Sequence, residues 1–413
     1  MTEPTPASTQ HVACCIVGGG PAGLVLGYLL ARSGVKVAVL EKHGDFLRDF
    51  RGDTIHPSTL QALDELGLVD ELLQLPHEKA HQVAGSVNGE TIVMGDFSRL
   101  NAKYKFIVFM PQWDLLNFLM RKAQAFPSFQ MLMKTEAKDL IIEANVIKGV
   151  RALSPDGEIE IRADLVVACD GRDSHTRERA GFTPKTLGAP MDVLWFKIGR
   201  NKADGEQPLG RMASGRILVA INRGDVWQCG YVIAKGTFDE ICNGSIENFR
   251  AAIVDMAPDL ADRVSDIASW DDVKLLTVAV DRLPLWHRPG LLCIGDAAHA
   301  MSPIGGIGIN LAIQDAIATA NLLAGKLRDH HVTDADLALV QKRREWPVRI
   351  TQWVQVAIQN RIIAPVLKSQ SAARPPWILR HLQSIPLLRT LPARFVAIGV
   401  RPEHIETKQM PPA

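Results

Sequence analysis

The sequence has little of what marks several classes of protein. Its 46 basic and 45 acidic residues leave a formal net charge of +1, so nothing indicates a nucleic-acid or strongly acidic partner. No uninterrupted apolar stretch reaches transmembrane length. The first ten residues, MTEPTPASTQ, have neither a basic n-region nor an apolar h-region, which predicts a disordered tail rather than a signal peptide.

The six cysteines form no C-x-x-C pair and have no metal-ligand spacing, so no metal site is expected. Most of them lie in apolar, strand-like runs, where cysteine acts as a small hydrophobic residue. This usage favours a reducing, cytoplasmic setting. With 413 residues, 47% of them apolar, the chain can bury a large core across two or three lobes.

The stretch that organises the chain is 14–41, CCIVGGGPAGLVLGYLLARSGVKVAVLE, which has the pattern strand, glycine-rich turn, helix, strand. Gly18, Gly20 and Gly23 form G-x-G-x-x-G. In a βαβ unit, the first glycine allows the tight turn and the second lets a pyrophosphate approach the backbone. The third lets the helix pack close to the strand.

Glu41 closes this unit at about the spacing where a carboxylate meets adenosine ribose hydroxyls. The stretch therefore predicts a bound dinucleotide, with a glycine turn that only assists packing as the alternative. The predicted site also includes Pro21 and Ala22 at the helix start and Lys42 after the glutamate. The stretch does not decide between FAD and NAD(P).

Two further strand–turn–helix patterns carry an acid and glycines. In 165–181, an apolar strand ends at Asp170-Gly171, with Ser174 and Arg177 following. In 291–316, a strand ends at Gly295-Asp296, and a glycine-rich loop then enters a long helix. That loop contains Pro303, Gly305, Gly306 and Gly308, and the helix begins near Asn310. The second pattern predicts another anion site, made by an acid and exposed helix-start N–H groups.

Between these patterns the periodicity changes to β type. The segments 83–108 and 187–272 contain short apolar runs separated by turn residues such as Asn88-Gly89, which indicate antiparallel strands. We expect them to form a sheet domain inserted into the dinucleotide-binding fold. Arg51 lies in a loop predicted to return toward the phosphates; a solvated arginine is the alternative. His56 is more often structural than a base.

The three motifs, in this order, resemble the class A flavoprotein monooxygenases, which include para-hydroxybenzoate hydroxylase and the ubiquinone-biosynthesis hydroxylases. The resemblance covers about residues 12–330 and implies an α/β fold of that type. It implies an FAD-binding domain made of 10–82, 109–186 and 273–330, with a substrate-binding β-sheet domain made of 83–108 and 187–272. A helical C-terminal region, 331–413, would follow.

The resemblance also implies site residues. Gly18, Gly20, Gly23 and Glu41 would bind the ADP half of FAD, and Arg51 its phosphate or flavin region. Gln112 would lie near the ribityl chain and Asp296 would hold the ribityl hydroxyls, whereas the motif with Asp170, Gly171 and Arg177 is tied to FAD and to NAD(P)H use. The flavin ring would be lined by Pro303 and the backbone of Gly305, Gly306, Gly308, Ile309 and Asn310.

The reaction that the resemblance implies consumes NADPH or NADH and dioxygen, and hydroxylates an aromatic or polycyclic molecule through a flavin hydroperoxide. The open alternatives are a halogenase, an oxidative dehydrogenase or an isoprenoid reductase on this scaffold, and a non-catalytic FAD-binding redox sensor. No residue is predicted to be catalytic beyond those lining the flavin.

Four residues of the inserted sheet are candidates for the substrate pocket: Phe196, Met212, Trp227 and Tyr231. For each one alone, a place in the sheet core is the more common outcome. The apolar, proline-punctuated C-terminal part is expected to pack on the parent domain, with dimerisation or contact with a membrane surface as alternatives. The chain is expected to be a monomer or a homodimer.

Overall fold

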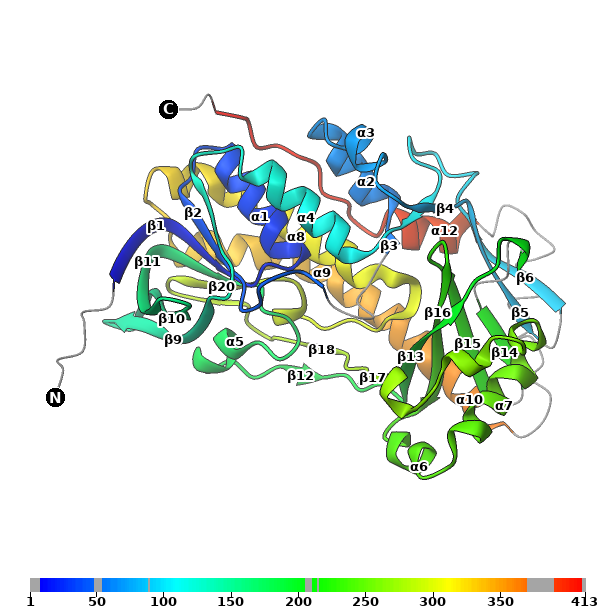
Figure 1. The fold of residues 1–413 in the computed structure, drawn as a ribbon. Helices are drawn as coiled ribbons and strands as arrows, with labels where there is room; N and C mark the ends of the chain where they lie inside the picture. Colours follow the sequence, from blue (N-terminus) through cyan, green and yellow to red (C-terminus); the bar gives the residue numbers. More distant parts are fainter. Residues whose placement is uncertain are drawn as a thin grey trace.

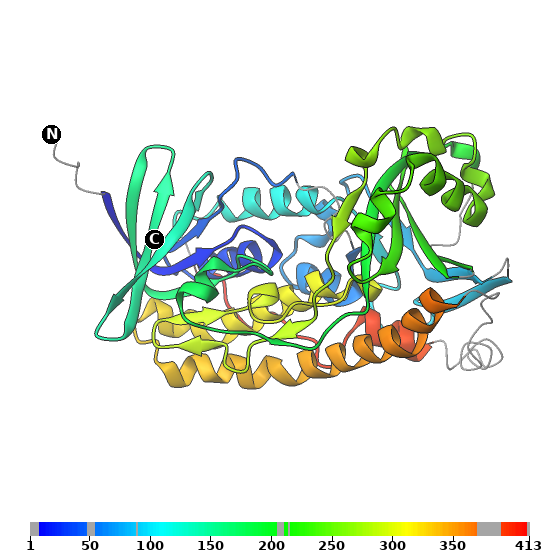
Figure 2. The ribbon, with the colours of Figure 1, turned by 90° about the horizontal axis from the view of Figure 1, so that it is seen from below.

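The computed structural model describes residues 8–47, 54–87, 90–204, 210–213, 215–369 and 390–410. Two lobes lie side by side, one built on a mainly parallel sheet and the other on a mainly antiparallel sheet (Figure 1). A long helix, α9 (Asp334–Ile358), runs along the outer edge of both lobes (Figure 2).

The first lobe contains five parallel strands in the order β20-β11-β1-β2-β8. Two strands, β10 and β9, continue from β11 in antiparallel pairing, and β19 pairs with β20. The bounds are β1 (Ser8–Val17), β2 (Val37–Leu40), β8 (Phe129–Leu132), β9 (Glu136–Glu143), β10 (Val146–Ser154), β11 (Gly157–Ala168), β19 (His287–Arg288) and β20 (Leu291–Cys293).

The strand β1 begins at Ser8, so the prediction that the first ten residues form a disordered tail is wrong for its last three residues. Ser8 pairs with Ile159 and Gln10 with Ile161. The long strand β11 extends past the apolar part of β1, so its main chain also pairs with the polar residues at the start of β1. The sequence did not show this extension, because backbone hydrogen bonds form without any hydrophobic pattern.

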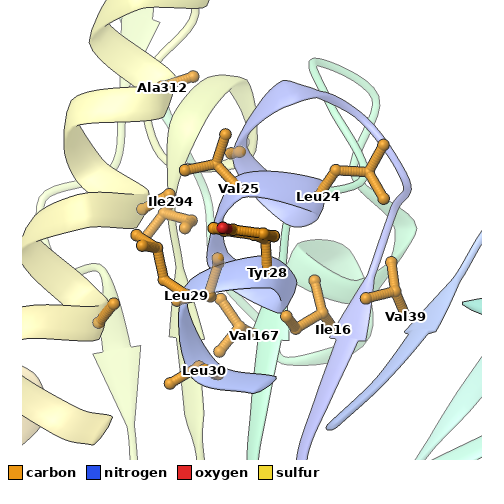
Figure 3. Packing of buried hydrophobic residues seen from close by; sticks show 14 of the residues in the cluster. Ile16, Leu24, Val25, Tyr28, Leu29, Leu30, Val39, Val167, Ile294 and Ala312 are labelled. Carbon is orange, nitrogen blue, oxygen red and sulfur yellow. The ribbon is translucent and has the colours of Figure 1, made fainter. Parts of the chain in front are cut away.

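Helix α1 (Pro21–Arg32) lies between the parallel sheet and α8 (Ile307–Arg328), with α4 (Gln112–Ala123) also packed against it. Figure 3 shows α1 residues such as Leu24 and Leu29 against Ile16 and Val167 of the strands. The helix α8 is long and apolar enough to cross a membrane by length and composition, but 78% of its most apolar window is buried inside the protein. It is therefore a core helix of this fold.

The second lobe is a seven-stranded sheet in the order β17-β13-β16-β15-β14-β5-β6, antiparallel except between β14 and β5. One face is covered by α7 (Ile246–Met256). The bounds are β5 (Gln82–Val87), β6 (Glu90–Asp96), β13 (Met191–Gly199), β14 (Gly210–Ala213), β15 (Arg216–Asn222), β16 (Val226–Ala234) and β17 (Lys274–Leu276).

Strands from the two β-type segments thus share one sheet, with two departures from the expected ranges. The strand β7 (Ile107–Phe109) pairs with β3 (Thr54–Ile55) and β4 (Glu78–Ala80) in a separate small sheet. The strand β17 pairs with β13, so the chain leaves this lobe only after Leu276. Smaller elements are α2 (Pro57–Glu65), α3 (Val69–Leu72), α5 (His175–Arg179), β12 (Lys185–Thr186), α6 (Phe238–Cys242) and β18 (Asp281–Arg282).

The C-terminal region is helical only in part. After α9 come a π-helical turn (Gln359–Ile363) and α10 (Ala364–Lys368), and the described chain resumes with α12 (Thr390–Ala397). Residues 398–410 contain no helix and run back along the first lobe, where Met410 N–H donates to Arg32 O. Their backbone groups find partners in other elements, including Glu65 and Asn321, so no local helix is needed.

Candidate functional site

The carboxyl ends of four parallel strands form one row across the sheet. The register pairs Leu40 with Val17, Val17 with Ala168, and Ala168 with Cys293. Each of these residues is followed within two positions by a residue of a predicted motif: Glu41, Gly18, Asp170 and Gly295. Three turns that lie far apart in the sequence therefore meet at one sheet edge, the edge where open α/β sheets bind ligands.

The first turn is held by close backbone packing. Gly18 has φ +108°, and a Cβ there would lie 2.5 Å from the carbonyl oxygen of Cys169 in the second motif. A Cβ on Gly23 would lie 2.0 Å from the carbonyl oxygen of Gly18. A Cβ on Gly20 would meet no atom of the described residues within 4 Å. Two glycines are thus required by the protein's own packing, whereas the middle one faces open space, as a phosphate-binding glycine must.

Around this turn, Glu41 accepts hydrogen bonds from the N–H groups of Gly19 (3.2 Å) and His43 (3.0 Å). Lys42 is exposed. Helix α1 begins at Pro21 with Gly20 as its N-cap and no side-chain cap among the described residues. The partial positive charge of the helix start therefore faces the open space beside Gly20.

In the second motif, Asp170 caps a helix. Its carboxylate accepts hydrogen bonds from the Ser174 hydroxyl and from Thr176 N–H (3.0 Å), which fixes the start of α5. Arg177 is buried and donates to the carbonyl oxygens of Ala297 (3.1 Å) and Arg172 (2.6 Å). Its guanidinium therefore joins the second turn to the third through their main chains.

Arg172 is a site residue that the sequence reasoning missed. Its Nε donates to Oδ2 of Asp296 at 3.1 Å, and Nη2 lies 3.4 Å from Met301 O. The side chains of Arg172 and Asp296 are 24% and 29% exposed, so the pair is at the surface of the site rather than inside the core. The available signal was the position of Arg172 directly after Asp170-Gly171.

The loop before α8 contains two adjacent glycines in the left-handed region, Gly305 (φ +76°) and Gly306 (φ +61°). A Cβ on Gly306 would lie 2.1 Å from Thr54 Oγ1, whereas one on Gly308 would make only an ordinary 3.6 Å contact with Met301. A side chain at Gly306 would therefore collide with Thr54, whereas Gly308 has room for a Cβ.

Asn310 holds this loop with its side chain. Oδ1 accepts from His56 N–H (2.8 Å) and from the Thr59 hydroxyl (2.8 Å), and Nδ2 donates to Thr54 O (3.0 Å) and Gly306 O (3.2 Å). Helix α8 begins after Gly306 with no side-chain cap and no acidic residue in its first turn. Pro303 and Ile309 are half-buried beside it.

The far side of the same loop is bound by two glutamines of α9 and by Gln359 of the π-helical turn after it, which the sequence reasoning did not single out. Gln355 accepts from Ser302 N–H (3.2 Å) and donates to Ser302 O (3.1 Å) and Ile304 O (3.0 Å). Gln352 donates to Ala300 O (3.1 Å), and Gln359 to Ser302 Oγ (2.9 Å). The signal was their spacing of three and four, which places buried amides on one helix face.

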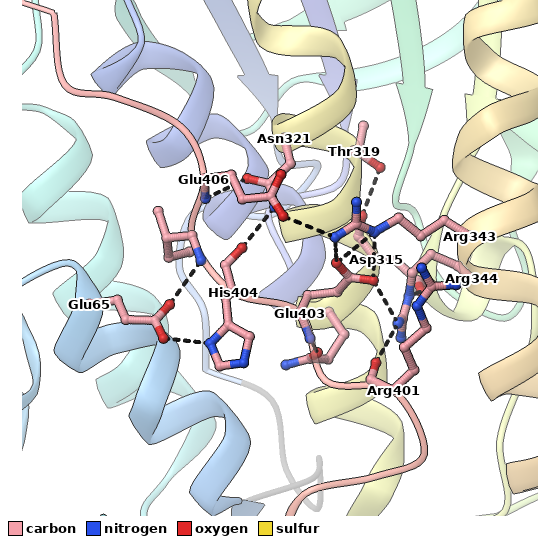
Figure 4. A network of polar contacts seen from close by, with 12 residues as sticks. Glu65, Asp315, Thr319, Asn321, Arg343, Arg344, Arg401, Glu403, His404 and Glu406 are labelled. Atoms are coloured by element: carbon pink, nitrogen blue, oxygen red, sulfur yellow. Dashed lines mark hydrogen bonds and ion pairs between the residues drawn. The ribbon is translucent and has the colours of Figure 1, made fainter.

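Behind the third turn lies a buried charge network, shown in Figure 4. One carboxylate oxygen of Asp315 accepts from Gly295 N–H (3.2 Å) and lies 2.6 Å from His299 Nε2, and the other accepts from Arg344 Nε (2.9 Å). Arg344 Nη1 reaches Glu403 of the C-terminal segment at 3.3 Å. Burial raises the pKa of Asp315, but His299 and Arg344 outweigh it and hold that pKa below its ordinary value.

The seven-stranded sheet separates the four pocket candidates onto two faces. Phe196, Trp227 and Tyr231 are buried on the face covered by α7, around Phe249. Met212 lies on the opposite face, in one cluster with Trp195 and Ile304 of the glycine loop. Three candidates thus lie in the sheet core on the α7 face and Met212 lies on the face toward the glycine loop, because alternate residues of a strand face opposite sides and composition cannot show which side meets the loop.

Gln112 is the first residue of α4 and is half-buried. Arg51 lies outside the described residues.

Comparisons with known proteins agree with this geometry. The family model described as "FAD binding domain" matches residues 11–354. The 6-methylpretetramide 4-monooxygenase of Streptomyces rimosus is 33% identical over 372 residues, covering 90% of this chain and 88% of that one. The chain belongs to the class A FAD-dependent monooxygenases. A para-nitrophenol 4-monooxygenase of Pseudomonas sp. (strain WBC-3) is 24% identical over 324 residues, covering 76% of this chain and 78% of that one.

Solved structures of this class share the fold. PqsL of Pseudomonas aeruginosa, in complex with 2-aminobenzoylacetate, superposes with a TM-score of 0.74 at 22% identity, covering 87% of this chain and 100% of that one. The p-nitrophenol 4-monooxygenase PnpA of Pseudomonas putida DLL-E4 has a TM-score of 0.73 at 19% identity, covering 95% and 100%. The predicted fold class is confirmed.

Proposed function

We propose that this FAD-dependent monooxygenase hydroxylates an aromatic, preferably polycyclic, small molecule, with NADPH or NADH as the electron donor. The observation that carries the proposal is the row Leu40–Val17–Ala168–Cys293, which brings three glycine-and-acid turns to one sheet edge. Bound FAD would supply the oxygen activation, in this class through a flavin hydroperoxide. The chain's own residues would bind and orient the FAD and the substrate, and would keep water away from them.

The residues present fit an extended FAD. The open space at Gly20 and the uncapped start of α1 suit the pyrophosphate, and Glu41 suits the adenosine ribose. Asp296, held by Arg172, suits the ribityl hydroxyls. The uncapped N–H groups at the start of α8 suit the pyrimidine edge of the ring, where negative charge develops on reduction. The seven-stranded lobe would then supply the substrate side.

The surface facing the glycine loop is apolar. Cluster members on that side include Val193, Trp195, Met212, Ile217 and Val232, together with Ile304 of the loop. Trp195 lies against the backbone of Gly230, where a Cβ would be 3.1 Å from its ring. Such a surface binds aromatic rings by burial and by ring contacts. The 33%-identical relative is named for a polycyclic substrate, which supports the preference for such a molecule.

The test uses purified protein with bound FAD and a panel of aromatic and polycyclic compounds. We expect a substrate that stimulates NAD(P)H oxidation and receives one atom of labelled dioxygen. Met212→Trp should raise KM for that substrate, because it fills the loop-facing side. The matched control Tyr231→Phe, on the α7 face, should leave KM unchanged. Chlorinated, desaturated or reduced product without oxygen incorporation would identify another flavin enzyme, and no substrate stimulation would contradict an enzyme role.

A further inference from the structure

The outer face of α9 exposes large apolar side chains in one line. Leu339, Trp346 and Trp353 are 47%, 57% and 69% exposed, and each follows the previous one by seven residues. Seven residues bring an α-helix back to nearly the same direction, with a drift of about 20°. The three side chains therefore form a stripe roughly 21 Å long, at 1.5 Å per residue. Exposed tryptophans in a row are not a normal feature of a solvated helix.

The stripe stands on a ridge rather than in a groove. The opposite face of α9 packs on α8 and β19, and its glutamines bind the glycine loop. Figure 2 shows the helix along the outer edge of the molecule. A long ridge with apolar side chains in one line can contact a plane along its whole length.

The charge beside the stripe is positive. Lys342 and Arg349, exposed and again seven residues apart, flank the tryptophans. Arg361 and Lys368 continue as exposed basic residues beyond α9. The only acidic residue of segment 339–368 is Glu345, which lies 3.8 Å from Arg349. The outer face is therefore both aromatic and cationic.

The combination of exposed tryptophans and basic residues indicates which kind of partner suits the outer face of α9. A second copy of the chain would place the same basic residues against each other, which is unfavourable at close range. An anionic bilayer surface suits both components, since tryptophan prefers the interface of a membrane and Lys and Arg bind lipid phosphates. We propose that the outer face of α9, defined by Leu339, Lys342, Trp346, Arg349 and Trp353, docks the protein peripherally on an anionic lipid surface.

The placement has a consequence for substrate access. The C-terminal end of α9 lies in the same apolar cluster as the glycine loop, where Ile358 and Ile304 are both members. Docking would thus place the candidate substrate side near the surface in which an apolar polycyclic molecule dissolves. The docking itself does not depend on which substrate the enzyme uses.

The experiment measures binding of the full-length FAD-loaded protein to vesicles of phosphatidylcholine alone and of phosphatidylcholine mixed with phosphatidylglycerol. We expect co-sedimentation only with the anionic vesicles, a blue shift of tryptophan fluorescence, and weaker binding at higher salt. Replacing both basic residues, Lys342→Gln with Arg349→Gln, should lower the partition coefficient about thirtyfold, from roughly 1 kcal/mol per basic residue. Trp346→Gln with Trp353→Gln should abolish both the binding and the blue shift.

Two single variants serve as matched controls: Leu153→Gln and Leu285→Gln. They replace apolar residues of similar exposure, 46% and 50%, outside α9, and should bind like the parent protein. The flavin spectrum and unfolding temperature of every variant verify folding. The proposal is overturned if the parent protein does not bind anionic vesicles or if the double tryptophan variant binds equally well. It is also overturned if the tryptophans are shielded from acrylamide in lipid-free protein, or if they mediate dimerisation instead.

Discussion

The two glycine-rich turns of the first lobe are held in place by different means. The turn after β1 is fixed by backbone contacts, with Gly23 against Gly18 and Gly18 against Cys169. The loop between β20 and α8 is fixed by buried polar side chains from α8 and α9, chiefly Asp315, Arg344 and Gln355. The first turn is thus held by close main-chain contacts, whereas the second is held by hydrogen bonds and charges of side chains.

The difference predicts which kind of substitution disrupts each turn. The backbone packing of the turn after β1 is disrupted when a single methyl group is added to one of its packed glycines, since no room exists for it. A buried polar network fails when one partner is removed, since the remaining charges and amides lose their compensation. Four experiments test this comparison.

The largest effect is expected from Arg344→Met. Its guanidinium is buried between Asp315 and Glu403, so its loss removes one cationic partner from each of two buried carboxylates. Asp315 then keeps His299, and Glu403 keeps Arg343. We expect a loss of about 3–5 kcal/mol in the free energy of unfolding, measured by urea denaturation. The control is Arg349→Met on the outer face of the same helix, where the ion pair is exposed and should contribute at most about 1 kcal/mol. Equal losses for the two variants would refute the role of the network.

The first turn is tested by Gly23→Ala and Gly20→Ala. A Cβ at Gly23 would overlap the Gly18 carbonyl oxygen, so we expect about 3 kcal/mol of destabilisation in the FAD-free protein. A Cβ at Gly20 meets open space, so the FAD-free protein should change by no more than about 0.5 kcal/mol. Its FAD affinity should nevertheless fall at least about tenfold, measured by fluorescence titration. Unchanged FAD binding by Gly20→Ala would contradict the phosphate assignment.

A pH effect is expected at His56, which lies under the glycine loop. Burial lowers the pKa of His56 to about 4, opposed by the backbone of Val396 and Gly305. The unfolded chain therefore binds a proton below about pH 6.5 that the folded chain does not bind until about pH 4. Stability should fall by about 2 kcal/mol between pH 7 and pH 5 from this residue. His56→Gln should lose that part of the pH dependence of stability. If the variant and the parent protein show the same dependence of unfolding free energy on pH, the effect does not come from His56.

The smallest effect is expected from Gln355→Leu, which removes partners from the main chain of Ser302 and Ile304. We expect about 1–2 kcal/mol of destabilisation. Gln355 holds the loop that is proposed to line the flavin. NAD(P)H oxidation should therefore also become less coupled to hydroxylation of the substrate, with a larger share of hydrogen peroxide in the products. Gln74→Leu, at an exposed position, should change neither quantity. A fully coupled Gln355→Leu enzyme would show that α9 does not position the loop.

Features that depend on neighbouring residues could be predicted from the sequence, whereas features that depend on contacts between distant residues could not. The βαβ unit and the two later strand–turn–helix motifs arise from local glycines and apolar runs, so the sequence shows them directly. The side on which Phe196, Trp227 and Tyr231 are buried depends on strand register against distant strands, so the sequence did not show that they lie on the α7 face. Asp315 is hydrogen-bonded to Arg344, 29 residues away, and Ser302 is hydrogen-bonded to Gln355, 53 residues away, which is beyond any local pattern.

The sequence by itself determined the chemistry of the three turns, because glycine conformations, strand ends and helix starts are properties of a few neighbouring residues. Only the tertiary structure decided how those turns are aligned and held, since a register row and a buried network require elements from the whole chain. It likewise decided which face of α9 remains in solvent. Helical periodicity defines faces, but packing chooses which one is covered.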